Sequence, residues 1–214
     1  AGLTSVTGSS SDWGDYDNDG DLDLVITGSD ASDNRTATIY ENQGGGTFAA
    51  IGAGLTSVDL NSSTDWGDYD NDGDLDLVLA GRGPGGPTAK IYENQGGGTF
   101  ADISAGLTGV QEGSSEWGDI DNDGDLDLIL TGSDESFNPT TAIYENQRPP
   151  LGPRSLVAIG AGLTGVEFSS SDWGDFDNDG DLDLVLTGDD ASGNETATIY
   201  ENQGGGTFAP LGAG

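Results

Sequence analysis

The chain contains no cysteine, histidine or methionine, and only five of its 214 residues are basic. Without cysteine there are no disulfide bonds and no thiolate metal sites, and without histidine the usual catalytic triads are excluded. The 39 acidic residues give a formal charge of −34, which would repel nucleic acid and anionic membranes. Apolar runs are too short for a membrane span, and no helical periodicity is visible. We therefore expect no nucleic-acid partner and no membrane insertion.

The acidic residues are concentrated in four copies of one nine-residue loop. These copies span residues 15–23, 68–76, 119–127 and 175–183, and each places five aspartates at alternate positions around a central glycine. So much negative charge in one turn repels itself unless a cation lies in the middle. Hard oxygen ligands with this spacing suit Ca²⁺. The predicted metal-site residues are Asp15, Asp17, Asp19, Asp21, Asp23, Asp68, Asp70, Asp72, Asp74, Asp76, Asp119, Asp121, Asp123, Asp125, Asp127, Asp175, Asp177, Asp179, Asp181 and Asp183.

The loop is not an EF-hand, because an EF-hand needs a bidentate glutamate at position twelve. In these loops position twelve is apolar: Ile26, Leu79, Leu130 or Leu186. The closing carboxylate must therefore be the aspartate at position nine. We assign side-chain ligands to positions one, three, five and nine, and a backbone carbonyl ligand to position seven. Mg²⁺ suits the loop poorly because it requires strict octahedral geometry.

We expect about four Ca²⁺ per chain, one in each loop. These ions would bring the formal charge from −34 to −26. A scaffold that needs several calcium ions of modest affinity fills where calcium is plentiful, which favours an extracellular location.

An internal repeat of 51–56 residues is marked by four tryptophans, Trp13, Trp66, Trp117 and Trp173. An Ala-Gly pair opens each repeat, which divides a single repeat domain, 1–214, into repeats 1–52, 53–104, 105–160 and 161–214. The third repeat differs, because residues 148–156 replace the Gly-Gly-Gly-Thr-Phe turn. In the second repeat, residues 81–87 replace the acidic second turn. Four of the five basic residues lie in or beside these two variants, which indicates either ordinary loop variation or a surface that faces a partner; they are Arg82, Lys90, Arg148 and Arg154.

Four short strands are expected in each repeat. In the first, one strand ends at Asp12-Trp13-Gly14, a second spans 22–27, a third spans 36–40, and a fourth lies around Thr47-Phe48. Apolar residues on both faces of the second strand indicate that it is covered on both sides. Four strands in about 50 residues are typical of propeller blades. We predict an all-β fold, a β-propeller of four four-stranded blades.

Two repeated features lie beside the acidic loops. The tryptophans two residues before each loop fit packing between blades, although a ring of aromatics could also stack sugars. The acids immediately before them fit extra metal ligands or a hydrogen-bonded edge; they are Asp12, Asp65, Glu116 and Asp172. Three Asn-x-Ser/Thr sequons, at Asn34, Asn61 and Asn194, match the glycosylation pattern in a chain where chance matches are expected.

The Asp-x-Asp-x-Asp-Gly-x-x-Asp loop, followed at once by a strand, resembles the FG-GAP/VCBS repeat family. The runs Trp-Gly-Asp-Tyr-Asp-Asn-Asp-Gly-Asp-Leu-Asp-Leu and Ile-Tyr-Glu-Asn-Gln-Gly-Gly-Gly-Thr-Phe are similar to its secreted VCBS-type members. The resemblance implies a calcium-binding propeller outside the cell, with ligands at the loop positions given above. The Phe-Gly/Gly-Ala-Pro signature is not legible, and the related integrin head has seven blades. The four blades could therefore close alone, belong to a larger ring, or form an open array that is closed by oligomerisation.

We predict an extracellular calcium-binding module with a structural or adhesive role, for example as a protomer of a surface fibre. Its expected partners are other copies of itself or extracellular protein and glycan ligands. A lectin-like propeller is the alternative. A polysaccharide-acting enzyme fits less well, because the distinctive carboxylates recur four times whereas a catalytic pair should be singular. We expect no enzymatic activity.

Overall fold

The strand-forming segments of the sequence build four separate antiparallel sheets. The computed structural model describes residues 2–148 and 154–211, and within them every regular element is a β-strand, so this part holds no helix that could cross a membrane. Part of the variant segment 148–156 lies outside the described residues.

Each sheet lies within one repeat and follows the order of the chain. The first contains β1 (Ser11–Gly14), β2 (Asp23–Ser29), β3 (Arg35–Asn42) and β4 (Phe48–Ala50). The second contains β5 (Asp59–Gly67), β6 (Asp76–Gly83), β7 (Gly86–Asn94) and β8 (Phe100–Asp102). The third contains β9 (Ser115–Gly118), β10 (Asp127–Ser133), β11 (Pro139–Gln147) and β12 (Ser155–Ile159). The fourth contains β13 (Glu167–Gly174), β14 (Asp183–Asp189), β15 (Glu195–Asn202) and β16 (Phe208–Pro210).

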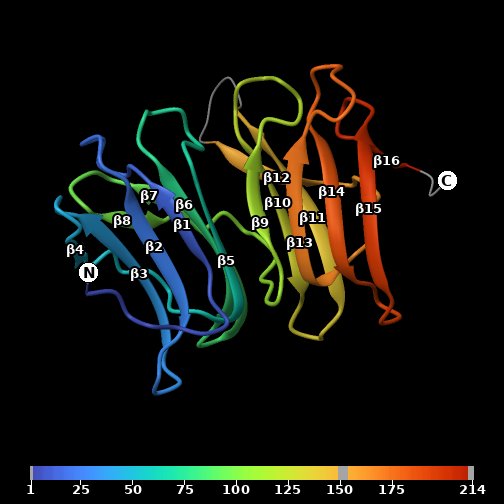
Figure 1. Ribbon diagram of the computed structural model, residues 1–214. Helices are drawn as coiled ribbons and strands as arrows, with labels where there is room; N and C mark the ends of the chain where they lie inside the picture. Colours follow the sequence, from blue (N-terminus) through green and yellow to red (C-terminus); the bar gives the residue numbers. More distant parts are fainter. Residues whose placement is uncertain (1, 149–153, 212–214) are drawn as a thin grey trace.

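The sheets are arranged as a row of stacked blades. The first and last sheets lie at opposite ends of the row, with the two chain termini beside them (Figure 1). The all-β prediction of four four-stranded blades is therefore confirmed, but the blades do not close into a ring. Of the three arrangements considered from sequence, closure of the four blades on themselves is the one that the structure contradicts.

The acidic loop joins the first two strands of each sheet. In the first sheet Gly14 pairs with Asp23 and Trp13 pairs with Leu24, so the loop is a hairpin closed at its ninth residue. The next residues, Leu24 and Val25, point to opposite faces of β2, and both are buried. The prediction that the second strand is covered on both sides is confirmed, because a neighbouring sheet covers one face and the linker before β1 covers part of the other.

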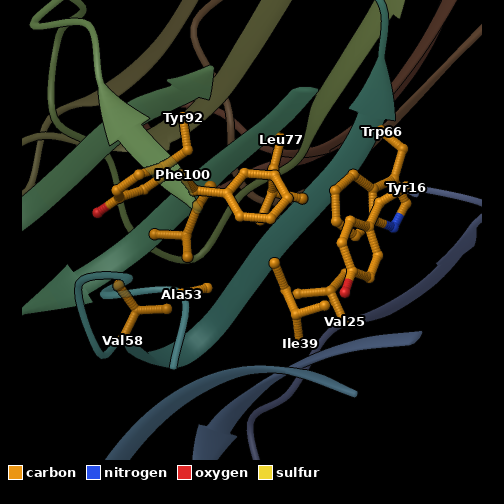
Figure 2. Packing of buried hydrophobic residues seen from close by; sticks show 10 residues of the cluster. Tyr16, Val25, Ile39, Ala53, Val58, Trp66, Leu77, Tyr92 and Phe100 are labelled. Carbon is orange, nitrogen blue, oxygen red and sulfur yellow. The ribbon is translucent and has the colours of Figure 1, made fainter. Parts of the chain in front are cut away.

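Apolar side chains from two sheets meet between each pair of neighbours. Figure 2 shows the first of these interfaces, where Val25 and Ile39 of the first sheet face Leu77 and Trp66 of the second. The Trp66 ring stacks on Tyr16, with centroids 6.4 Å apart and planes 13° from parallel. Aromatic pairs of this kind stabilise a fold beyond the effect of burying their apolar surface. Packing between blades, one of the two roles considered for the tryptophans, is the one seen here.

A glycine at the end of the first strand makes room for the tryptophan of the following sheet. A Cβ atom on Gly14 would lie 2.9 Å from the Trp66 ring, and one on Gly67 would lie 2.7 Å from the Trp117 ring. Gly118 stands in the same relation to Trp173, with 2.9 Å. Each sheet therefore fits onto the next through a glycine hollow and an indole ring, and an added methyl group would separate them.

Three of the five basic residues, those of the first two sheets, bind other parts of the chain. Arg35 of the first sheet pairs with Asp59 of the second at 3.1 Å, and Arg82 donates to Gln111 at 2.9 Å. Lys90 pairs with Asp102 at 2.7 Å within the second sheet. These contacts hold the chain's own strands and sheets together, so they give no support to a partner-facing basic surface.

We predict that Gly67→Ala destabilises the chain by about 1–3 kcal/mol, because its methyl group would overlap the Trp117 ring. Gly174→Ala, the same change at the end of the last sheet, meets no atom within 4 Å and should leave the stability almost unchanged. Denaturant unfolding of both variants in calcium at dilute protein concentration tests this pair. Equal destabilisation of the two would contradict the proposed fit between indole and glycine.

Candidate metal centre

Backbone N–H groups of the acidic loop turn inward onto its own carboxylates. In the first loop Asp15 accepts hydrogen bonds from the N–H groups of Asp19 and Gly20, each at 3.0 Å. The N–H of Asp21 donates to Asp19 at 2.8 Å. The other three loops repeat this pattern with almost the same distances. These hydrogen bonds of the turn therefore orient the carboxylates.

Two residues of each loop have positive φ. The asparagine at position four has φ between 59° and 64°, and the glycine at position six has φ between 89° and 98°. Asparagine tolerates the left-handed region better than most residues, and glycine adopts it without steric cost. This explains why the sequence has Asn and Gly at these two positions in all four loops.

The aspartate at position nine is buried under each loop. Asp76 is 1% exposed; its two oxygens accept hydrogen bonds from the N–H groups of Asn94 at 2.8 Å and Tyr69 at 3.2 Å. Burial raises the pKa of Asp76 to about 7, although those N–H donors lower it in part. Asp127 has the same surroundings, and burial raises its pKa to about 7 as well. A carboxylate this costly to ionise would be stabilised in its charged form by a divalent cation.

The structure brings three predicted ligands together in every loop. In three loops the groups are Asp68, Asp70 and Asp76; Asp119, Asp121 and Asp127; and Asp175, Asp177 and Asp183. In the first loop the group is Asp15, Asp17 and Asp19. One oxygen from each member of a group lies within 4.8 Å of the others. Two ligands on opposite sides of one Ca²⁺ are about 4.6–5.2 Å apart, so the residues fit such an ion.

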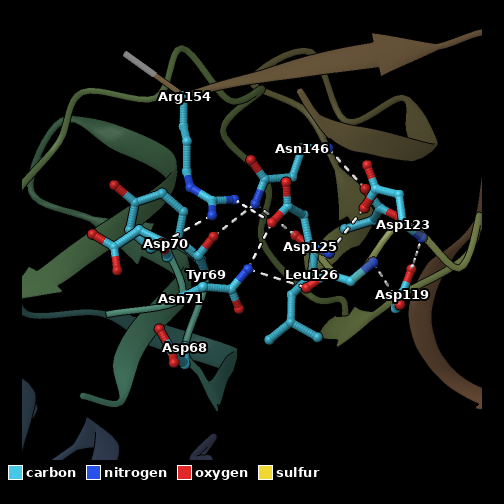
Figure 3. A network of polar contacts seen from close by, with 12 residues as sticks. Asp68, Tyr69, Asp70, Asn71, Asp119, Asp123, Asp125, Leu126, Asn146 and Arg154 are labelled. Carbon is cyan, nitrogen blue, oxygen red and sulfur yellow. Dashed lines mark hydrogen bonds and ion pairs between the residues drawn. The ribbon is translucent and has the colours of Figure 1, made fainter. Parts of the chain in front are cut away.

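The aspartate at position seven connects neighbouring loops. Asp74 accepts a hydrogen bond from Asn18 of the preceding loop at 2.8 Å, and Asp181 accepts one from Asn122 at 2.8 Å. Asp125 accepts one from Asn71 at 2.6 Å and also pairs with Arg154 at 2.8 Å (Figure 3). These side chains therefore face the adjacent repeat, which leaves the backbone carbonyl of position seven as its predicted ligand.

Sequence reasoning missed the asparagine and the glutamate of the Tyr-Glu-Asn-Gln run, which occurs at the same place in each repeat. Asn94, Asn146 and Asn202 each donate to a backbone carbonyl of the preceding loop at 2.8 Å. Glu93 carries negative charge close enough to raise the pKa of Asp70, after the larger effects of burial and Asp72. The signal was present, since this run recurs at one phase in all four repeats, but its role depends on a neighbouring blade.

The acids that precede the tryptophans lie in a row between the sheets, apart from the clusters. Asp65 accepts a hydrogen bond from the backbone N–H of Trp117 at 2.8 Å, and burial raises the pKa of Asp65 to about 6. Glu116 is the next member, and burial together with repulsion from Asp172 and Asp65 raises the pKa of its carboxyl to about 8. These residues fit a hydrogen-bonded edge better than additional metal ligands.

We predict that Glu116→Gln weakens the pH dependence of stability. The folded chain binds the Glu116 proton more tightly than the unfolded chain, where the pKa is about 4.5, so this group lowers stability progressively as pH rises from about 4.5 to about 8. The stability of the variant relative to the parent should rise by about 1–2 kcal/mol between pH 6 and pH 9. Chemical unfolding in calcium at both pH values measures it.

The control for this prediction is Glu135→Gln, which removes the same charge from an exposed turn. It should leave the pH dependence as it is. A parallel response in both variants would assign the effect to net charge and contradict the role of burial at Glu116.

Comparison with known proteins agrees with this geometry. The FG-GAP-like repeat model matches residues 15–79 and 68–130, and each match begins on an acidic loop and ends in the strand that follows the next loop. Together the matches cover 15–130, more than half of the chain. No curated protein matches the chain significantly. The matching loops, the strand that follows each of them and the fourfold recurrence of this unit show that the chain belongs to the FG-GAP-like repeat family.

Proposed function

We propose that this chain is an extracellular calcium-binding structural module, with one Ca²⁺ in each acidic loop, that serves in adhesion or as a protomer of a surface fibre. The observation that carries the proposal is the recurrence of one carboxylate cluster at one place in all four blades. A catalytic site would be expected once. A site repeated with every structural unit fits an ion that maintains the structure.

The chain's own residues explain how an ion would stiffen the row. In the second, third and fourth loops the cluster joins the start of the hairpin, at position one, to the base of the second strand, at position nine. The position-nine aspartate also accepts the backbone N–H of an asparagine at the end of the third strand, as in Asp76 with Asn94 at 2.8 Å. When bound, Ca²⁺ supplies the positive charge that lets these carboxylates stay together. Three strands of a blade are thereby held at one point.

A lectin-like function receives less support. The sugar-stacking alternative needs tryptophan faces in solvent, but Trp66 is buried, and Trp117 and Trp173 are half-buried between sheets. Trp13 alone among the four is widely exposed. An extracellular location is supported by the number of calcium sites and by the acidic surface, which keeps the particle dispersed in salt.

We expect chelation of calcium to lower the melting temperature by tens of degrees. Removing the ions leaves 20 loop carboxylates to repel one another, four of them at the buried ninth position. Thermal unfolding in EGTA and after restoring Ca²⁺ tests this, and native mass spectrometry should count about four ions per chain. Restoration by Mg²⁺ at equal concentration, or a melting temperature indifferent to EGTA, would contradict the proposal.

We expect Asp76→Asn to cost much more stability with calcium than without it. In calcium it should remove one site and lower stability by about 2–4 kcal/mol. In EGTA the loss should be much smaller, because the change also removes a buried charge whose pKa burial raises to about 7, which offsets the loss of one of the two N–H acceptors. Asp74→Asn, at position seven, is the matched control and should retain the bound ion. Calorimetric titration counts the sites, and loss of an ion in both variants or in neither would reject the assigned ligand set.

A further inference from the structure

The two end sheets expose opposite halves of the interface that lies between every pair of inner sheets. We call the outer face of the fourth sheet the trailing face, defined by Gly174, Phe176, Val185 and Ile199. Val185 is 41% exposed and Ile199 is 42% exposed. Their counterparts in the first three sheets are fully buried; these are Val25, Ile39, Val78, Ile91, Ile129 and Ile143. The trailing face is thus a surface that the fold covers three times and leaves bare once.

We call the outer face of the first sheet the leading face, defined by Leu3, Trp13 and Leu22. Trp13 is 53% exposed, whereas its counterpart Trp66 is 9% exposed under the first sheet. Leu22 is 55% exposed, whereas its counterpart Leu75 lies against Gly14 and is partly buried. The leading face therefore presents the indole ring and the leucine that enter each inner interface. Figure 1 places the two faces at opposite ends of the row.

The shapes of the two faces are complementary. At the three inner interfaces the tryptophan ring fills the space above Gly14, Gly67 or Gly118. Above Gly174 a Cβ atom would meet nothing within 4 Å. The trailing face therefore has the open space above Gly174 with no tryptophan in it, and the leading face has the exposed ring of Trp13 with no glycine beneath it.

The hydrogen-bonding groups are complementary as well. At each inner interface an asparagine at loop position four donates to the position-seven aspartate and the position-six carbonyl of the next loop. Within the residues that the structure describes, Asn178 on the trailing side has no such acceptor, and Asp21 on the leading side has no such donor. A second hydrogen bond runs from the following sheet back to the preceding one: Asn94 donates to the backbone carbonyl of Tyr16. At the two ends of the row the equivalent donor is Asn42, on the first sheet, and the equivalent acceptor is the backbone carbonyl of Phe176, on the fourth.

We propose that the trailing face of one chain binds the leading face of a second copy, head to tail. Trp13 would lie over Gly174, Asn178 would donate to Asp21, and Asn42 would donate to the carbonyl of Phe176, so the junction repeats the inner interfaces. Because the contact uses different surfaces on the two partners and leaves both outer faces free, it propagates into chains of molecules. This inference gives the partner for the proposed structural function and rests on it, since calcium must first neutralise the two loops that meet.

Sedimentation velocity of the 214-residue chain in calcium, over a range of protein concentrations, tests the proposal. We expect concentration-dependent oligomers, strengthened by added salt because both partners are strongly acidic. Gly174→Ala should weaken association about tenfold or more, because its methyl group would occupy the place of the Trp13 ring. Trp13→Ala should weaken it as well. Gly160→Ala is the matched control, since a Cβ there also meets nothing within 4 Å.

Mixing the two variants gives the sharper result. Trp13→Ala keeps a trailing face and Gly174→Ala keeps a leading face, so an equimolar mixture should form dimers and stop there. A chain that stays monomeric in calcium, or that associates equally well with Gly174→Ala, overturns the proposal. A monomer whose melting temperature falls with Gly174→Ala also overturns it, because that result means the faces meet within one molecule. In each of these cases calcium titration still reports separately on the proposed function.

Discussion

The structure depends on the gathering of carboxylates whose mutual repulsion the strands must overcome. Five aspartates within nine residues are held at the closed end of a hairpin, and strand pairing places the ninth of them opposite the glycine that precedes the first. Asp23 and its counterparts are almost fully buried, where ionisation is costly. A hairpin built in this way is strained electrostatically when empty and is suited to a divalent ion when filled. An ion bound in each loop would therefore stabilise the fold of its blade.

The same constraint shapes the contacts between blades. The aspartates at position seven lie outside the clusters, and those of the second, third and fourth loops accept hydrogen bonds from the preceding repeat, as Asp74 does from Asn18 at 2.8 Å. Below the loops, the tryptophan of one sheet and the glycine of the previous sheet fix the distance between the sheets. The contacts between loops and the contacts in the core thus set the same distance between neighbouring sheets. A substitution in one set of contacts therefore affects the other set. This coupling explains how a chain with few apolar residues builds three ordered interfaces.

The sequence was sufficient for the hairpin and the strands of one repeat. Alternating aspartates around a glycine predict the hairpin, and Val25 on the face opposite Leu24 and Ile26 predicts a second strand covered on two faces. The relation between repeats was not predictable in the same way. Whether four blades close or remain in a row depends on a small rotation per blade, which accumulates from contacts such as Trp66 on Gly14. Likewise, the hydrogen bonds of Asn18 and Asn94 are made to a neighbouring blade, so the sequence of one repeat does not reveal them.

The distribution of charge and of short strands also determines where the row can grow. The outermost strands β4, β8 and β16 are only three residues long, which limits pairing along the sides of the row. The loops place acidic residues along one side, where two rows brought together would repel each other even with calcium bound. The ends differ, because Trp13, Val185 and Ile199 are apolar and exposed. Lateral association is thus opposed by charge and by strand length, whereas the proposed head-to-tail contact would bury apolar side chains against the repulsion of two acidic chains and the cost of ordering two matched surfaces.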